Sequence, residues 1–244
     1  MLRWNYTTCD KRYCRGKPVL LPPTCLLCRS VGREDLDLCE YCYRELPWLQ
    51  QDQLCLACGL FCSAKGEVCG GCLKSPFAFQ RCYGVFSYDA ASSFLVKQLK
   101  FSERLACGRV LVKLMAAKII DLYERQALPE VIIPMPLHNN RLFRRGFNQS
   151  SELAKPLAGL LQVSYQHNLL LRVKPTAAQS SLPVKKRRAN VISAFKAKAS
   201  SYKHVALLDD VVTTGSTAHA AAKALLKIGV ERVDVWCAVR VQRS

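Results

Sequence analysis

One segment of the chain places a strand, an acid pair, a hydroxyl-rich turn and a helix in direct succession. Val205–Leu208 are apolar and predict a buried parallel strand. Asp209 and Asp210 follow at its C-terminal end, and the turn Thr213–Thr217 leads into an expected helix over Ala218–Lys227. In open α/β sheets, ligands bind outside the carboxyl ends of the strands. The segment therefore predicts an α/β fold with a binding site at this strand end.

The acid pair and the turn suit different parts of a sugar phosphate. A phosphate is attracted by the backbone N–H groups and hydroxyls of such a turn, and by the positive end of the helix dipole. Carboxylates repel phosphate but suit the hydroxyls of a sugar or a Mg²⁺ ion. We therefore predict a ribose 5-phosphate site, against the alternative of an ordinary solvated turn. A Walker P-loop is excluded, because its Gly-Lys-Ser/Thr ending is absent from this turn.

Cysteines are concentrated in four Cys-x-x-Cys pairs, which form two groups with equal spacing. Two such pairs place four thiolates around one zinc ion and leave no open position, which predicts a structural double zinc ribbon with one or two ions. Sequential pairing is simplest, and interleaving of the first and third pairs is also allowed by the spacing. Redox chemistry is less suitable, since so many pairs exceed what a thioredoxin-like site needs. The expected ligands are Cys25, Cys28, Cys39, Cys42, Cys55, Cys58, Cys69 and Cys72.

The chain has 244 residues, which is enough for two domains of unequal size. We expect a poorly ordered extension at residues 1–21, the zinc ribbon at 22–75 and a second domain at 76–244. No apolar run approaches the roughly 18 residues of a membrane span, and no secretory signal is recognisable. We therefore expect a cytoplasmic protein without membrane insertion. The net charge of +18 favours a phosphate-rich partner, although good solubility is the plainer explanation.

A second strand, loop and helix occur upstream in the same order. Val131–Ile133 predicts a buried strand, Pro136 and Leu137 follow in a loop, and Asn148 is the expected cap of a helix over Gln149–Leu161. This loop is basic instead of acidic. Guanidinium groups bind pyrophosphate well, whereas a solvated basic turn is the alternative. The basic residues are Arg141, Arg144 and Arg145.

The remaining pattern predicts further strands and helices. A basic run, Lys185–Arg188, indicates a solvated loop or one that closes over a bound phosphate. The final strand could place Trp236 and Arg240 in or near the sheet. The expected elements are strands at Cys82–Tyr88 (an edge), Leu169–Arg172 and Arg232–Val241, and helices at Ser92–Leu99 and Ala106–Glu124.

The first segment resembles the phosphoribosyl-pyrophosphate (PRPP) motif of the type I phosphoribosyltransferases. By this resemblance Asp209 and Asp210 hold the ribose 2- and 3-hydroxyls, and the turn Thr213–Thr217 surrounds the 5-phosphate. The PRPP-binding residues that it implies are Asp209, Asp210, Val211, Val212, Thr213, Thr214, Gly215, Ser216, Thr217, Pro136, Leu137 and Arg141.

The order of the motifs is similar to that of the ComF/GntX family of bacterial proteins. The motifs are KQLKF, PMPLHNNRLFRRGFNQS, TAAQSSLPVKKRRANVISAF and LLDDVVTTGST, behind the zinc ribbon. The resemblance implies a type I phosphoribosyltransferase fold, a parallel sheet with helices on both faces, preceded by the double zinc ribbon with its four-cysteine sites. It also implies a part in competence and the use of external DNA, and a weaker link by name to gluconate use. Further family positions are Lys100, Arg144, Arg145, Asn148, Gln149, Gln179, Arg187 and Asn190.

The resemblance implies a PRPP-binding phosphoribosyltransferase that uses PRPP together with Mg²⁺. Asp209 and Asp210 would orient the sugar, while Arg144, Arg145 and Lys100 would stabilise the departing pyrophosphate. The alternative is a basic nucleic-acid-binding adaptor, or a regulator of the DNA-uptake machinery without transferase activity. The expected partners are PRPP, single-stranded DNA or nucleotides, and a DNA-uptake helicase. No pattern identifies the acceptor of the ribose.

Overall fold

The chain forms two compact units, Met1–Glu45 and Leu46–Ser244, each with one of the two cysteine groups. A computed structural model describes residues 23–33, 35–62, 66–101, 105–138, 142–143, 146–173 and 194–242, without the side chains of residues 100 and 101. The expected N-terminal extension and the basic run Lys185–Arg188 lie outside these ranges. The expected boundary at residues 75 and 76 stays a prediction.

The smaller unit is built around its cysteines. Cys25 and Leu38 are fully buried, and the short helix α1, Glu40–Arg44, begins after Cys39. Arg33 forms a 2.9 Å ion pair with Glu40 of this helix. With so few apolar side chains, a segment of this size depends on metal for its stability.

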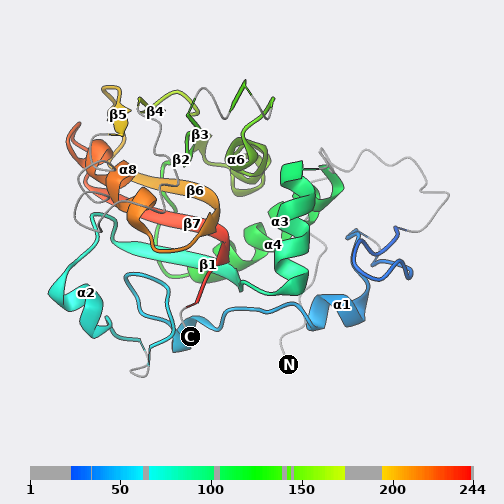
Figure 1. The fold of residues 1–244 in the computed structure, drawn as a ribbon. Helices are drawn as coiled ribbons and strands as arrows, with labels where there is room; N and C mark the ends of the chain where they lie inside the picture. The colour runs from blue at the N-terminus through cyan, green and yellow to red at the C-terminus, as the bar shows by residue number, and fades with distance from the viewer. Residues whose placement is uncertain are drawn as a thin grey trace, which may run out of the picture. The chain divides into compact units, whose positions relative to one another are not determined.

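The larger unit contains a five-stranded sheet in the order β1-β7-β6-β2-β3. Every neighbouring pair of strands is parallel, and Figure 1 shows β1, β7 and β6 side by side. The sheet therefore confirms the predicted α/β class, with β1 at an edge as expected. The strands are β1 Arg81–Ser87, β2 Val131–Pro134, β3 Ser164–Tyr165, β6 His204–Val212 and β7 Arg232–Arg240.

Strand β6 is longer than the apolar run predicts. It continues through Asp209 and Asp210 to Val212, instead of ending before the acids. The neighbouring strand β7 pairs with it along this extension, with Cys237 opposite Asp209. This pairing overrides the low strand propensity of aspartate. As a result, the backbone of the acid pair is fixed by a sheet instead of belonging to a loop.

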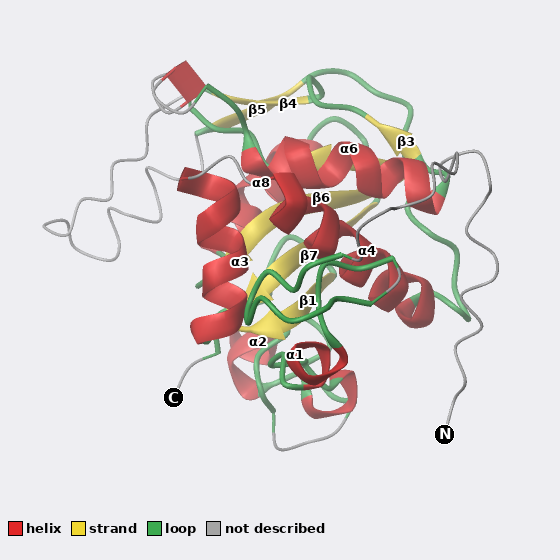
Figure 2. Ribbon diagram, turned by 90° about the vertical axis from the view of Figure 1, so that its right-hand side faces the viewer, coloured by secondary structure: helices red, strands yellow, loops and turns green. Residues whose placement is uncertain are grey.

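Helices cover both faces of the sheet, as the resemblance implied. Val233 and Val235 of β7 pack in one apolar cluster with Ala221. Trp236 points the opposite way, with its ring centroid 5.6 Å from that of Tyr123. Figure 1 shows α8 on one side of the strands, and Figure 2 looks from the side of α3, α4 and α6. These helices are α3 Ala90–Phe101, α4 Leu105–Leu122, α6 Gln149–Leu161 and α8 Ser216–Leu226.

Smaller elements complete the described part of the larger unit. The predicted strand near residue 170 is present as β4, Leu170–Arg172, but it pairs antiparallel with β5, Phe195–Ala197, in a sheet of its own. The 3-10 helix η2, Gln51–Gln53, precedes the second cysteine group, and helix α2, Gly70–Lys74, contains its last member, Cys72. Among the described residues, no helix combines the length and apolarity needed to cross a bilayer.

A buried aspartate at the amino end of the sheet is fully paired. Asp234 has no exposed surface, and its Oδ2 accepts a 2.6 Å hydrogen bond from Tyr123 and a 2.9 Å bond from Arg232. His204 Nε2 lies 2.9 Å from the same oxygen. Burial acts to raise the pKa of this carboxyl, but the bonds from His204, Tyr123 and Arg232 hold it below its ordinary value.

Candidate functional site

The carboxyl ends of β2 and β6 form the topological switch point of the sheet. The two strands are neighbours, but the chain leaves β2 through α6 toward β3 on one side, while β6 lies on the other. Ligands of open α/β sheets bind at this position, because the connections on either side diverge. The loop with Pro136 and Leu137 and the acid pair therefore meet where the sequence predicted a ligand.

The two carboxylates sit close together in a partly buried setting. Asp210 is only 7% exposed and Asp209 is partly buried. Asp209 Oδ1 accepts a hydrogen bond from the backbone N–H of Asp210 at 2.9 Å, which fixes the orientation of the Asp209 carboxylate. Burial raises the pKa of Asp209 to about 8, and the charge of Asp210 adds to the shift. Such a pair is poised to gain from a ligand that supplies hydroxyl donors or a cation.

The first turn of α6 reaches the acid pair from the side of β2. Asn148 caps the helix by accepting from Ser150 N, as predicted, and its amide donates to Met135 O at 3.1 Å. The hydroxyl of Ser150 donates to Asp209 Oδ1 at 3.0 Å and acts to lower the pKa of that carboxyl. Sequence analysis did not assign Ser150 a role, although it lies in the quoted FNQS motif.

The hydroxyl-rich turn is open on its outer side. Thr213, Thr214 and Ser216 are exposed, and the Thr214 hydroxyl lies 3.0 Å from that of Ser216. Gly215 precedes α8 with φ 78°, a left-handed conformation that disfavours a side chain. The glycine thus lets the chain turn sharply from β6 into the helix, whose positive dipole end favours an anion at this turn. The N–H of Ser216 donates to the Thr214 hydroxyl at 3.3 Å.

The other predicted site residues fall into two sets. Pro136 and Leu137 follow β2 at the switch point and are partly exposed. Lys100 lies near the end of α3, and only its backbone is described. The assigned roles of these residues stay predictions. The residues outside the described ranges are Arg141, Arg144, Arg145, Gln179, Arg187 and Asn190.

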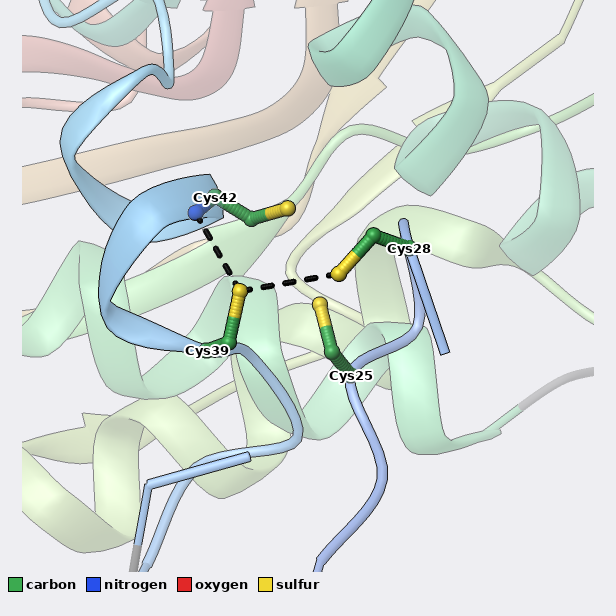
Figure 3. Close-up of side chains that lie close together, drawn as sticks. All are labelled: Cys25, Cys28, Cys39 and Cys42. Atoms are coloured by element: carbon green, nitrogen blue, oxygen red, sulfur yellow. Dashed lines mark hydrogen bonds between the residues drawn. The ribbon is translucent and has the colours of Figure 1, made fainter. Parts of the chain in front are cut away.

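The cysteines assemble into two groups in sequential pairing, which excludes the interleaved alternative. In each group the four sulfur atoms lie within 4.8 Å of one another, and Figure 3 shows those of the first converging. The Sγ atoms of Cys28 and Cys39 are 3.6 Å apart, and those of Cys58 and Cys69 are 3.9 Å apart. Zn–S bonds of about 2.3 Å in a tetrahedron require sulfur atoms about 3.8 Å apart. Both groups therefore fit structural zinc.

Each cysteine group has the same type of backbone turn directly after its first Cys-x-x-Cys pair. Arg29 has φ 69° and Gly59 has φ 66°, so both adopt the left-handed conformation. The sequence predicts tight turns at both Gly59 and Gly71. The prediction is confirmed at Gly59. It is wrong at Gly71, which lies inside α2 and has no positive φ.

Comparison with known proteins agrees with this architecture. Residues 18–73 match the double zinc ribbon domain family, and residues 147–244 match the phosphoribosyl transferase domain family. The chain is similar to the DNA utilization protein YhgH of Salmonella typhimurium, with 36% identity over 224 residues, 90% of this chain and 98% of the relative. Competence protein F of Haemophilus influenzae is 34% identical over 219 residues, 87% of this chain and 94% of that protein.

A crystal structure of adenine phosphoribosyltransferase aligns with 59% of this chain and 75% of its own. The identity is 13% and the TM-score is 0.36, a value too low to support any argument about the site.

Proposed function

The chain belongs to the ComF/GntX family, and from this premise we propose that it binds PRPP and transfers ribose 5-phosphate from it. One observation carries the proposal: Asp209 and Asp210 stand beside the open turn Thr213–Thr217 at the switch point of the sheet. An acid pair followed closely by a turn suited to an anion matches a molecule with a diol next to a phosphate.

The parts of PRPP match the parts of the site. The 5-phosphate would accept from the N–H groups and hydroxyls of the turn, where the α8 dipole favours negative charge. The ribose 2- and 3-hydroxyls would donate to Asp209 and Asp210, whose hydrogen bonds to Ser150 and to the backbone already fix their orientation. Mg²⁺ bound with PRPP would neutralise charge on the pyrophosphate, and these hard oxygen donors suit it.

Transfer would replace one bond at the anomeric carbon. A nucleophilic acceptor would form a bond to this carbon while the bond to the pyrophosphate oxygen breaks, and pyrophosphate would leave with the electron pair. Lys100, Arg144 and Arg145 are proposed to stabilise the charge on this leaving group. The acid pair would orient the sugar and stabilise positive charge that develops on the ring.

Calorimetric titration with PRPP and Mg²⁺ tests the binding step. We expect saturable binding by the wild type and a loss of at least about 100-fold in affinity when Asp209→Asn is combined with Asp210→Asn. Asp121→Asn is the control, because this exposed acid pairs with Lys118 away from the site. An absence of binding by the wild type, or an unchanged affinity of the double variant, would refute the proposal.

Pyrophosphate release separates a transferase from a regulator. We expect release in the presence of a suitable base or nucleotide acceptor, and none with the double variant. Tight PRPP binding without pyrophosphate release for any purine or pyrimidine acceptor would favour the regulator that lacks transferase activity.

A second candidate function is nucleic-acid binding in competence or DNA utilization. The net charge of +18 and the names of the relatives favour it. Fluorescence anisotropy with single-stranded DNA should give an affinity that falls steeply with salt, because phosphate contacts release counterions. Affinity no greater than that of a basic control protein would end this candidate. The expected DNA-uptake helicase and the cytoplasmic location stay predictions.

A further inference from the structure

The last residue of β7 joins the second cysteine group to the turn beside the acid pair. The Arg240 side chain is 1% exposed. Its Nε donates to the backbone O of Cys58 at 2.9 Å, and one terminal nitrogen donates to Val212 O at 3.1 Å and also to Thr213 O. One guanidinium therefore holds a cysteine-bearing turn and the first residue of the phosphate-binding turn at the same time.

Gln242 holds the same cysteine-bearing turn from a second point. Its side-chain amide donates to Gly59 O at 3.1 Å, and its carbonyl accepts from Phe61 N at 2.8 Å. The segment from Cys58 to Phe61 is thus attached to the C-terminal end of β7 by hydrogen bonds with two side chains, Arg240 and Gln242.

Phe77 provides an apolar connection between the same two regions. It packs against the cluster of Cys55, Cys58 and Cys72, and also against the core cluster that includes α8. A Cβ at Gly215 would lie 3.2 Å from its ring, so Phe77 covers the glycine at the start of α8. The next residue, Ala78, donates its N–H to His219 of that helix at 2.9 Å.

The backbone of the cysteine-bearing turn packs closely against the sheet. A Cβ at Gly59 would lie 2.5 Å from Cys82 O of β1, so the cysteine-bearing turn rests directly on the sheet. Gly84 likewise leaves room for Arg240. The equivalent position in the first group is Arg29, a residue with a full side chain and almost the same φ. Only in the second group does this turn require glycine.

We propose that Arg240, Gln242 and Phe77 are positioning residues, through which zinc at the second cysteine group holds the phosphate-binding turn in its PRPP-binding conformation. The inference rests on the proposed function. Without metal, the four sulfur atoms of this cluster lose the ion that would hold them together, so the carbonyl that Arg240 binds would lose its fixed position. Thr213 would then lose the support of a buried cation. Zinc at the first group, in the other unit, should have no such effect.

Reciprocal coupling can be measured on the wild-type protein without any substitution. If zinc strengthens PRPP binding, PRPP must retain zinc by the same factor. We expect saturating PRPP with Mg²⁺ to raise the affinity of one zinc site by at least about tenfold, measured by equilibrium competition with a chelator, and to leave the affinity of the other site unchanged. Inorganic pyrophosphate with Mg²⁺ is the control for chelation by the ligand. Equal zinc affinities with and without PRPP, with PRPP binding shown by calorimetry, would overturn the inference.

Matched serine variants identify the responsible group. Cys39 and Cys69 are the third cysteines of their groups. We expect Cys69→Ser to weaken PRPP binding by about tenfold or more, and Cys39→Ser to change it by less than about twofold. Each variant should lose one zinc ion. Equal PRPP affinities in the two variants, with the second zinc shown to be absent from Cys69→Ser, would contradict the coupling.

Milder changes separate positioning from folding. Gln242→Ala removes both side-chain hydrogen bonds from this partly exposed residue to the cysteine-bearing turn. We expect about threefold weaker PRPP binding and faster zinc release from the second group. Arg240→Met should have a larger effect, which Arg240→Lys should partly restore. If the wild type binds no PRPP, the proposed function fails; if it binds PRPP and Gln242→Ala changes neither quantity, the positioning role fails instead.

Discussion

The two ends of the central sheet both bury aspartate, but they treat its charge in opposite ways. At the amino end Asp234 has hydrogen-bond partners in Tyr123, His204 and Arg232, and its pKa lies below the ordinary value. At the carboxyl end burial raises the pKa of Asp209 to about 8, with Asp210 adjacent. The first carboxylate is stabilised by the fold itself. The carboxylates of the second pair accept hydrogen bonds from Ser150 and from the backbone, and a bound cation or hydroxyl donor would stabilise their charge further.

This difference separates a structural from a functional role for one residue type. Removal of a buried acid that is paired destabilises the fold because its partners are left uncompensated, whereas an acid with a raised pKa beside a second acid is typical of a functional site. Substitutions at the two ends should therefore act on different measurable quantities: stability at the amino end and ligand affinity at the carboxyl end.

The largest effect is expected at the amino end. Asp234→Ala leaves Arg232 and the Tyr123 hydroxyl without their shared acceptor, and should lower the free energy of unfolding by about 3 kcal/mol. Thermal melting with zinc present measures this. PRPP affinity of the folded protein should change by less than about twofold, since the acid pair is untouched. A loss of affinity without a loss of stability would break the comparison.

The next effect concerns stabilisation by ligand. At about 100 times its Kd, PRPP with Mg²⁺ should stabilise the wild type by about 2.7 kcal/mol. The variant with Asp209→Asn and Asp210→Asn should melt no lower than the wild type without ligand, and PRPP should no longer shift its melting temperature. A double variant that is much less stable without ligand would show that the pair is structural after all.

A pH effect of smaller size should appear at the carboxyl end. The raised pKa of Asp209 means that the folded state binds a proton more tightly than the unfolded state. The stability of the free protein should thus fall as pH rises from 3.8, the ordinary pKa, to about 8, and level off above this value. The fall should be on the order of 1 kcal/mol because partial exposure screens the charge. Melting curves across this range measure it, and Asp209→Asn should flatten the profile. A profile that stays equally steep in Asp209→Asn would assign the titration elsewhere.

Removal of one hydroxyl should have the smallest effect. Ser150→Ala removes the hydrogen bond to Asp209 and should weaken PRPP binding by about fivefold, near 1 kcal/mol. Ser151→Ala is the neighbouring control. Calorimetry would contradict the assignment if both variants bound PRPP like the wild type.

The carboxyl-end site could be predicted from sequence because its strand, acids and turn are contiguous. Local patterns also gave both cysteine groups and the cap at Asn148. Each of these patterns is short, and the residues that act together lie close together in the sequence. The same reasoning was wrong about the end of β6, which it placed before the acid pair. The strand continues because it pairs with β7, a segment that is distant in the sequence.

The amino-end network could not be predicted. Tyr123 follows α4 and His204 begins β6, and they meet Asp234 and Arg232 of β7 only through the fold. Arg240 is a similar case, since its acceptors on Cys58, Val212 and Thr213 lie on two distant segments. No pattern of residue spacing in the sequence predicts such contacts, because they depend on the order of the strands and on which side chains become buried.

A crystal structure of the protein with PRPP and Mg²⁺ tests the central claim most directly. It should show the 5-phosphate at the N–H groups of Thr213–Thr217 and the ribose diol at Asp209 and Asp210. PRPP bound at another surface, with this strand end bare, would contradict the claim.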